Sequence, residues 1–217
     1  MYAGIGALLL ADGRLPTGGY AHSGGLEPAL AAGLDLGDVP AYMRARLQTV
    51  GLVDASAAVL ARRSDGLADL QAALLARIPS EPLRAASTSL GRGLTRLARR
   101  LWPEHHATHM LEALPSAPLR PIALGAIGAI LELEERQIAR ISLYDDAQTV
   151  AAAALKLLPV DPADAARWVL ESAPIVEESV LLAVATSRPQ QLPALTAPLI
   201  EQWSLDHSAR TRRIFVA

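Results

Sequence analysis

Residues 80–101 read SEPLRAASTSLGRGLTRLARRL, and their pattern decides the fold class. The leucines fall on one face of an α-helix: Leu83, Leu90, Leu94, Leu97 and Leu101. The arginines fall on the opposite face: Arg84, Arg92, Arg96, Arg99 and Arg100. Ser80, followed by Glu81 and Pro82, is typical of a helix N-terminus, because serine caps a helix and proline is tolerated in its first turn. The stretch therefore predicts a long amphipathic helix.

The same helical period recurs along the chain, and strand alternation does not. Residues 39–50 predict a second helix, opened by Asp38 and Pro40, and residues 67–78 a third, opened by Asp65. A fourth starts at Asp161, Pro162 and Asp164, runs through Trp168, and should kink or break at Pro174. Because the strand–helix alternation of an α/β enzyme is missing, residues 1–217 are predicted to form one compact all-α, multi-helix domain.

Composition excludes several classes of protein. The chain is 51% hydrophobic and 19% charged, has a net charge of −2, and contains no cysteine. Disorder, a disulfide scaffold and thiolate chemistry are excluded, and nucleic-acid binding is not expected. The apolar surplus suggests surface beyond the core that partners could cover. At 4% aromatic residues, such contacts should be broad and rich in Ala and Leu.

The longest apolar runs do not predict membrane spans. Residues 5–10, 121–131 and 147–158 fall well short of the roughly 20 residues that a spanning helix needs. No basic segment precedes residues 5–10, as a secretory signal would require. The runs are interpreted as core helices, so the chain is expected to be soluble and cytoplasmic, with no membrane contact.

Residues 15–27, LPTGGYAHSGGLE, are the densest group of turn-forming and polar side chains. One interpretation is a nucleophile elbow at Ser23, with Asp161 or Asp164 and then His207 completing a serine hydrolase triad in chain order. That motif needs a strand before the serine, and the residues upstream do not predict one. A P-loop is excluded because its Gly-Lys-Ser/Thr ending is absent.

A third interpretation of the same stretch is a structured loop between helices. It would present the polar side chains of His22, Ser23 and Glu27 at the surface of that loop. In its simplest form it is a capped turn in which Ser23 bonds nearby backbone groups.

Residues 104–109, EHHATH, form one metal-like cluster. If they are helical, His105, His109 and Glu112 share a face, and imidazole with carboxylate suits Ni²⁺ or Zn²⁺. His105, His106 and His109 would then support a free-standing metal buffer as an alternative function. No fourth ligand can be named, so His105 and His109 are weak candidates.

Two further segments carry predictions about packing. Gly125 and Gly128 would allow a close helix crossing, either inside the core or with a partner. Residues 204–217 are basic and end apolar, with the single Phe at position 215. That phenylalanine suggests docking onto the chain's own core or onto a partner, whereas His207 is expected to be a polar surface residue.

Residues 12–27 resemble the N-terminal signature of the urease accessory protein UreF family. In that signature an Asp and a Leu-Pro-Thr-Gly-Gly lead to an aromatic residue, a His-Ser pair and Gly-Leu-Glu. Weaker matches follow in order: Arg84, Ser87, Gly91, Arg92 and Leu94; residues 121–130 and 155–159; Pro198, Leu199, His207, Arg210, Arg212 and Phe215. The chain departs from the pattern at Asp161-Pro162, at Ser208 and at its last four residues.

The resemblance implies an all-α homodimer with no catalytic activity of its own. Such a protein bridges a UreD/UreH-type scaffold and a UreG-type GTPase, so that nickel is inserted into apo-urease. It holds no cofactor stably, and nickel passes in transit. The implied partner or metal-path surface comprises Gly18, Gly19, Tyr20, His22, Ser23, Glu27 and Arg92. The implied scaffold-docking residues, within the tail 204–217, are His207, Arg210, Arg212, Arg213 and Phe215.

Overall fold

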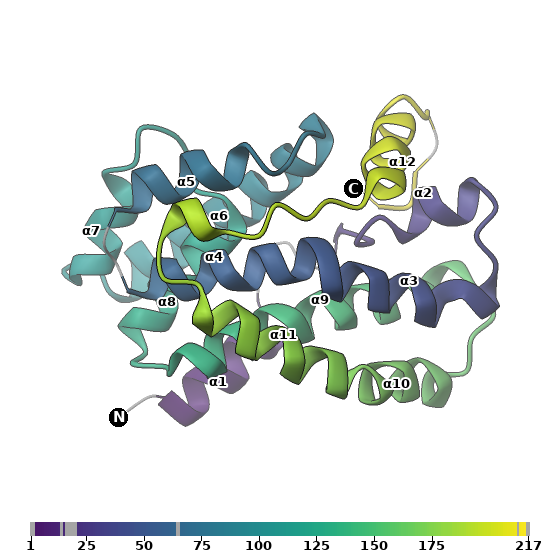
Figure 1. Cartoon of the computed structure of the whole chain (residues 1–217), viewed down its shortest axis with the longest axis horizontal. Coiled ribbons are helices and arrows are strands. Elements are labelled where there is room, and N and C mark those ends of the chain that lie inside the picture. The colour runs from purple at the N-terminus through teal and green to yellow at the C-terminus, as the bar shows by residue number, and fades with distance from the viewer. Residues whose placement is uncertain (1–2, 14, 16–20, 64–65, 212, 216–217) are drawn as a thin grey trace.

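The computed structural model describes residues 3–13, 15, 21–63, 66–211 and 213–215, and in that part of the chain it contains helices and no strands (Figure 1). This confirms the all-α prediction. The α-helices are α1 (Ala3–Ala11), α2 (Leu26–Ala31), α3 (Val39–Arg46), α4 (Leu52–Arg62), α5 (Leu67–Leu75), α6 (Glu81–Leu101), α7 (His106–Glu112), α8 (Arg120–Ile130), α9 (Glu135–Leu157), α10 (Pro162–Glu171), α11 (Ala173–Ala185) and α12 (Pro198–Ser208).

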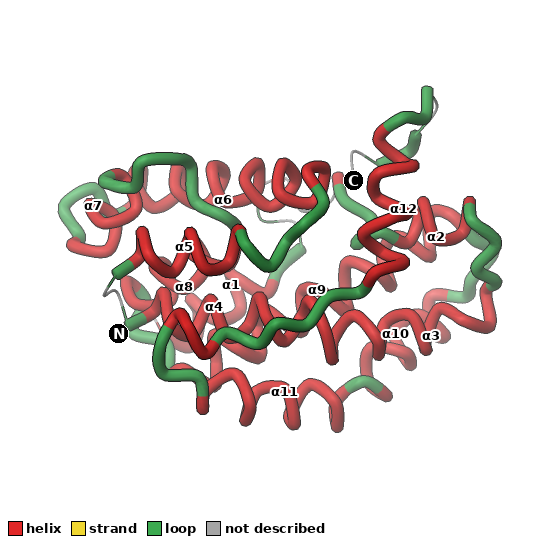
Figure 2. The backbone as a smooth tube through the Cα atoms, turned by 45° about the horizontal axis from the view of Figure 1, so that its top comes forward, coloured by secondary structure: helices red, strands yellow, loops and turns green. Residues whose placement is uncertain are grey.

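Helix α4 is the centre of the fold. It packs against α8, α9 and α11, while α6 and α11 lie on opposite sides of it (Figures 1 and 2). Its sequence is rich in alanine, so neighbouring helices can approach closely on several faces. The crossing with α8 is closest at Gly125, where an added Cβ would lie 2.2 Å from the carbonyl oxygen of Ala58. Gly125 and Gly128 therefore serve internal packing.

Helix α6 begins as its sequence predicts. The Ser80 Oγ accepts a hydrogen bond from the Leu83 backbone N–H, so Ser80 is the N-cap. The buried Glu201 of α12 accepts another bond, at 2.9 Å, from the Ser80 backbone N–H. The start of α6 is thereby fixed to α12, which brings the C-terminal part of the chain to the body of the protein.

Other helix boundaries differ from the predictions in informative ways. The helix predicted over 39–50 does not stop there, because a π-helical segment, Leu47–Gly51, joins α3 to α4. The left-handed Gly66 precedes α5, and Asp65 lies outside the described residues. The Asp161 side chain caps α10, and the chain breaks between α10 and α11 next to Pro174, as predicted.

Two groups of exposed apolar side chains account for part of the compositional surplus. Helix α1 was expected to be a core helix, but Ile5 is 74% exposed and Leu8 69% exposed. In α10 and α11, Leu170, Leu181 and Leu182 are also exposed. No helix in the described part of the chain is long and apolar enough to cross a bilayer.

Candidate functional site

The turn before α2 is held in place by Tyr42 of α3. Its hydroxyl donates a 2.7 Å hydrogen bond to the Gly24 carbonyl, and burial raises the pKa of Tyr42 to about 12, which keeps the phenol protonated. Gly24 and Gly25 both have positive φ, and a Cβ on Gly25 would lie 2.7 Å from the Tyr42 oxygen. Only glycine fits there, because a side chain would collide with the Tyr42 hydroxyl and the backbone is left-handed.

Ser23 is fully buried within this turn. Its Oγ accepts a hydrogen bond from the Glu27 backbone N–H at 3.4 Å, which confirms the capped turn. No strand precedes Ser23 in the described residues, and Asp161 caps a different helix, α10. The strand–turn–helix context and the triad geometry of a serine hydrolase are therefore not formed.

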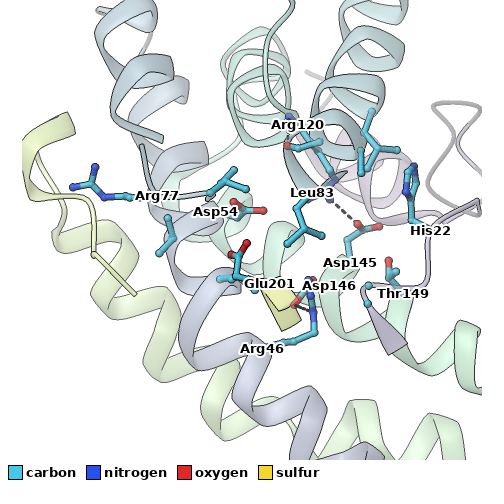
Figure 3. Close-up of a pocket in the computed structure, with 18 of the residues that line it drawn as sticks. His22, Arg46, Asp54, Arg77, Leu83, Arg120, Asp145, Asp146, Thr149 and Glu201 are labelled. Atoms are coloured by element: carbon cyan, nitrogen blue, oxygen red, sulfur yellow. Dashed lines mark hydrogen bonds and ion pairs between the residues drawn. The ribbon is translucent and has the colours of Figure 1, made fainter. Parts of the chain in front are cut away.

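His22 borders a cavity of about 150 Å³ beneath the turn, lined by charged and apolar side chains (Figure 3). Its walls come from α3, α4, α6, α8, α9 and α12. Two ion pairs cross it: the Nη2 of Arg46 lies 2.5 Å from Asp146, and the Nη2 of Arg120 lies 2.6 Å from Asp145. Each of these arginines therefore has a carboxylate partner, and other polar side chains also line the cavity.

Asp54, unlike Asp145 and Asp146, lines the cavity without an arginine partner in the described chain. Among the described residues its side chain makes no hydrogen bond or ion pair, and Figure 3 shows it between Glu201 and Arg120. Burial raises the pKa of Asp54 to about 7; Arg120 and Arg46 oppose that shift and Asp146 adds to it. The carboxyl group is therefore divided between its neutral and ionised forms near neutral pH.

The pKa of Asp54 predicts a pH dependence of stability. This carboxyl ionises near pH 7 in the folded chain and near pH 3.8 in the unfolded chain. Its favourable contribution to the free energy of unfolding is therefore fully present below about pH 4, and it is lost as the pH rises to about 7. At pH 8, Asp54→Asn should exceed the wild type in free energy of unfolding by roughly 2–4 kcal/mol. Urea titrations from pH 4 to 8 measure the difference. The exposed Asp69→Asn is the control, and a pH-independent difference for Asp54→Asn would contradict the assignment.

His22 supplies a second unpaired group to the cavity. Its Nδ1 is buried without a hydrogen-bond partner, and burial, with the nearby Arg120, lowers the pKa of His22. An imidazole and a titrating carboxyl thus line the same cavity, and both are ligand types that suit borderline divalent metals. In the described part of the chain no three His, Asp or Glu side chains are grouped closely enough to hold a metal ion.

Glu27 does not line this cavity but fastens the C-terminal segment. Its two carboxylate oxygens accept hydrogen bonds, each 2.8 Å long, from the backbone N–H groups of Ile214 and Phe215. Phe215 is 4% exposed, so it packs on the chain's own core, with the Lys156 ammonium 4.9 Å from its ring centroid. Figure 1 shows the C-terminal end beside α12.

The expectation that His207 lies on the surface is wrong. The residue is 3% exposed, and its Nε2 lies 3.4 Å from the Phe215 carbonyl and 3.7 Å from the Glu27 carboxylate. Residues 213–215, which fold back onto Glu27, bury His207. The contact between this C-terminal segment and Glu27 joins residues too far apart in the sequence for a local pattern to reveal it. Arg210, Arg213 and Ile214 remain exposed around this contact.

The remaining predicted site residues are dispersed. Arg92 is exposed on α6 and lines a different groove. Gly18, Gly19, Tyr20 and Arg212 lie outside the described residues.

The predicted metal face at residues 105–112 is wrong. His105 is not helical: it is the extended N-cap of α7, and its Nδ1 accepts a hydrogen bond from the Ala107 N–H at 3.1 Å. His105 therefore lies before the helix and does not share a helix face with His109 and Glu112.

Sequence patterns missed most of the charged groups around the cavity: Arg46, Asp54, Arg120, Asp145 and Asp146. One signal was present, because Asp54 interrupts the apolar run 50–60 and a charge in such a run needs a structural reason. The pairing of residues 46 and 146 spans 100 positions and has no local signal.

In the described residues, the fold and the site define an all-helical protein with a cavity of charged and apolar side chains under a glycine-rich turn, and with a C-terminal segment fastened beside that turn. The UreF family model matches residues 35–173. A protein of Mycobacterium sp. (strain JLS), named "Urease accessory protein UreF", is 39% identical over 213 residues, covering 97% of each chain. Proteins of the same name from Mycolicibacterium vanbaalenii and Mycobacterium tuberculosis (strain H37Ra) are 37% and 35% identical, again over 97% of each chain. The chain belongs to the UreF family of urease accessory proteins.

Proposed function

We propose that this chain is a non-catalytic adaptor in urease maturation. It bridges a UreD/UreH-type scaffold and a UreG-type GTPase, and the assembly inserts nickel into apo-urease at the expense of GTP. The observation that carries this proposal is the match, over 97% of each chain, to proteins named urease accessory protein UreF. Nucleotide hydrolysis belongs to the GTPase, because this sequence has no P-loop.

The fastened tail provides the scaffold-docking surface in this proposal. Glu27 accepts a hydrogen bond from the Ile214 backbone, and Ile214 itself is 68% exposed. The neighbouring Arg213 is also exposed. An exposed apolar side chain beside an arginine is typical of an interface residue pair. Docking therefore needs the tail in its closed position.

Nickel, as cargo, passes through the cavity beneath the turn. His22 and Asp54 offer one imidazole and one carboxylate, which bind Ni²⁺ when both are deprotonated. Two such ligands are too few for a closed site, so the ion is released again. No cofactor is held stably.

Homodimerisation is part of the same proposal. The exposed leucines of α10 and α11, Leu170, Leu181 and Leu182, are more than half exposed in the single chain. These helices run along one edge of the molecule in Figure 1, and a second copy would cover their leucines. Such a contact would be aliphatic, in keeping with the low aromatic content.

Co-expression with the scaffold, the GTPase and urease tests the proposal. The wild-type chain should co-purify with the first two, with two copies per complex by mass measurement, and should be required for nickel in urease. His22→Ala/Asp54→Ala should leave the complex intact and lower urease nickel about tenfold, the scale expected when metal-contacting groups are lost. The exposed pair His106→Ala/Asp69→Ala is the matched control. Nickel-loaded urease without the chain would refute the adaptor role, and normal loading by the cavity variant would refute the path alone.

A further inference from the structure

The exposed side of α6 carries four arginines, Arg92, Arg96, Arg99 and Arg100, that have no carboxylate partner in the described chain. Several arginines elsewhere are paired, for example Arg46 with Asp146 and Arg140 with Glu177. Arg96 lies four residues after Arg92, and Arg99 and Arg100 lie three and four residues after Arg96, so the four charges share one helix face and add locally. This concentrates positive charge on a chain whose net charge is −2.

Three of these arginines form one wall of a groove of about 390 Å³. The facing wall is formed by α7 and by the segment that leads from it to α8, through Leu111, Glu112, Leu114, Ser116, Ala117 and Pro118. Leu111 and Pro118 are buried, so the apolar surface beside the guanidinium groups comes from the half-buried Leu114 and Ala117. A ligand of matching chemistry would combine negative charge with an apolar side chain.

The groove is fixed in shape before any ligand binds. The buried Gln71 donates to the Ser116 hydroxyl at 3.0 Å and to the Ala117 carbonyl at 3.1 Å, and it accepts from the Leu119 N–H at 3.0 Å. At Gly91 an added Cβ would lie only 2.0 Å from the Pro118 carbonyl oxygen. The facing wall is therefore fixed to the protein by hydrogen bonds and by this close approach, so a ligand need not order it.

We propose that this groove binds an acidic segment of a partner protein, in extended form, with an apolar side chain directed at Leu114. Arginine forms bidentate pairs with carboxylates, and a row of them matches a row of acidic side chains. Glu112 lies in the same groove and opposes an unbroken polyanion such as nucleic acid. A protein segment can place neutral or apolar residues opposite Glu112. This site goes beyond the adaptor role and does not depend on the identity of the GTPase or scaffold.

Fluorescence anisotropy with a labelled peptide of alternating Glu and Leu tests the site. The wild-type chain should bind it, and Arg92→Ala/Arg96→Ala/Arg99→Ala should weaken binding about tenfold, the sum expected for three exposed ion pairs. Arg44→Ala/Arg136→Ala/Arg188→Ala removes the same charge from exposed positions outside the groove and should bind as the wild type does. Circular dichroism checks that each variant is folded.

Several results would overturn the proposal. These are no binding by the wild-type chain, equal weakening in both triple variants, or equal binding of a peptide with Gln in place of Glu. Tighter groove-dependent binding of a DNA duplex or of phosphatidylserine vesicles would assign the arginines to another class of partner. Peptide binding would stand even if the chain formed no complex with the scaffold or the GTPase, so the two proposals can fail separately.

Discussion

Gly125→Ala is expected to lower the free energy of unfolding by about 3 kcal/mol. The new methyl group would lie 2.2 Å from the Ala58 carbonyl oxygen, 2.7 Å from the Ala61 Cβ and 2.9 Å from the Arg62 nitrogen. Two of these atoms are backbone, so relief requires α8 and α4 to separate along the crossing at the centre of the fold. Overpacking of this kind costs roughly 1–3 kcal/mol or more, and it outweighs the gain of up to about 1 kcal/mol in helix propensity.

Gly4→Ala is the matched control, because Gly4 is also helical but nothing lies within 4 Å of an added Cβ. There the same substitution should stabilise the chain slightly, so the two variants should shift the urea midpoint in opposite directions. An unchanged midpoint for Gly125→Ala would show that the crossing relaxes easily.

Glu27→Ala is expected to release the C-terminal segment and to abolish co-purification with the scaffold. The carboxylate accepts two backbone hydrogen bonds, from Ile214 and Phe215, and charge-assisted bonds of this kind contribute about 1.5–3 kcal/mol each. Without them, the remaining contacts of Phe215 must hold the tail alone. Amide hydrogen exchange over residues 204–215 should accelerate, and limited proteolysis should cleave there first.

Glu178→Ala, at an exposed glutamate of α11, is the control for Glu27→Ala. Unchanged exchange in the tail would show that Glu27 is not its fastening. Accelerated exchange with normal scaffold binding would instead place the docking surface elsewhere and leave the fastening intact.

Local signals predicted much of the fold. Ser80 and Asp161 were identified as caps because a capping side chain and its target N–H are two or three residues apart. The π-helical segment Leu47–Gly51 was not predicted, because it is one additional residue in a turn of an otherwise regular apolar pattern. His105 was assigned to a helix face because its role as a cap depends on where the helix begins, which periodicity alone fixes only approximately.

The candidate site was predicted less completely than the fold. His22, Ser23 and Glu27 stood out because they form one dense stretch that resembles a family signature. Asp54, Arg46 and their neighbours did not, since the cavity forms only where separate helices meet. The burial of His207 has the same origin, because it depends on the tail returning to Glu27.

The bonds from Glu27 to residues 214 and 215 also set an order of events during synthesis. They join positions 187 and 188 residues apart, so the ribosome must complete nearly all of the intervening helices before the contact can form. Contacts of such separation are entropically costly until the body between them has folded. A nascent chain that has not yet reached Phe215 therefore lacks this contact, and the proposed docking surface forms only after residues 214 and 215 have been made and the intervening helices have folded.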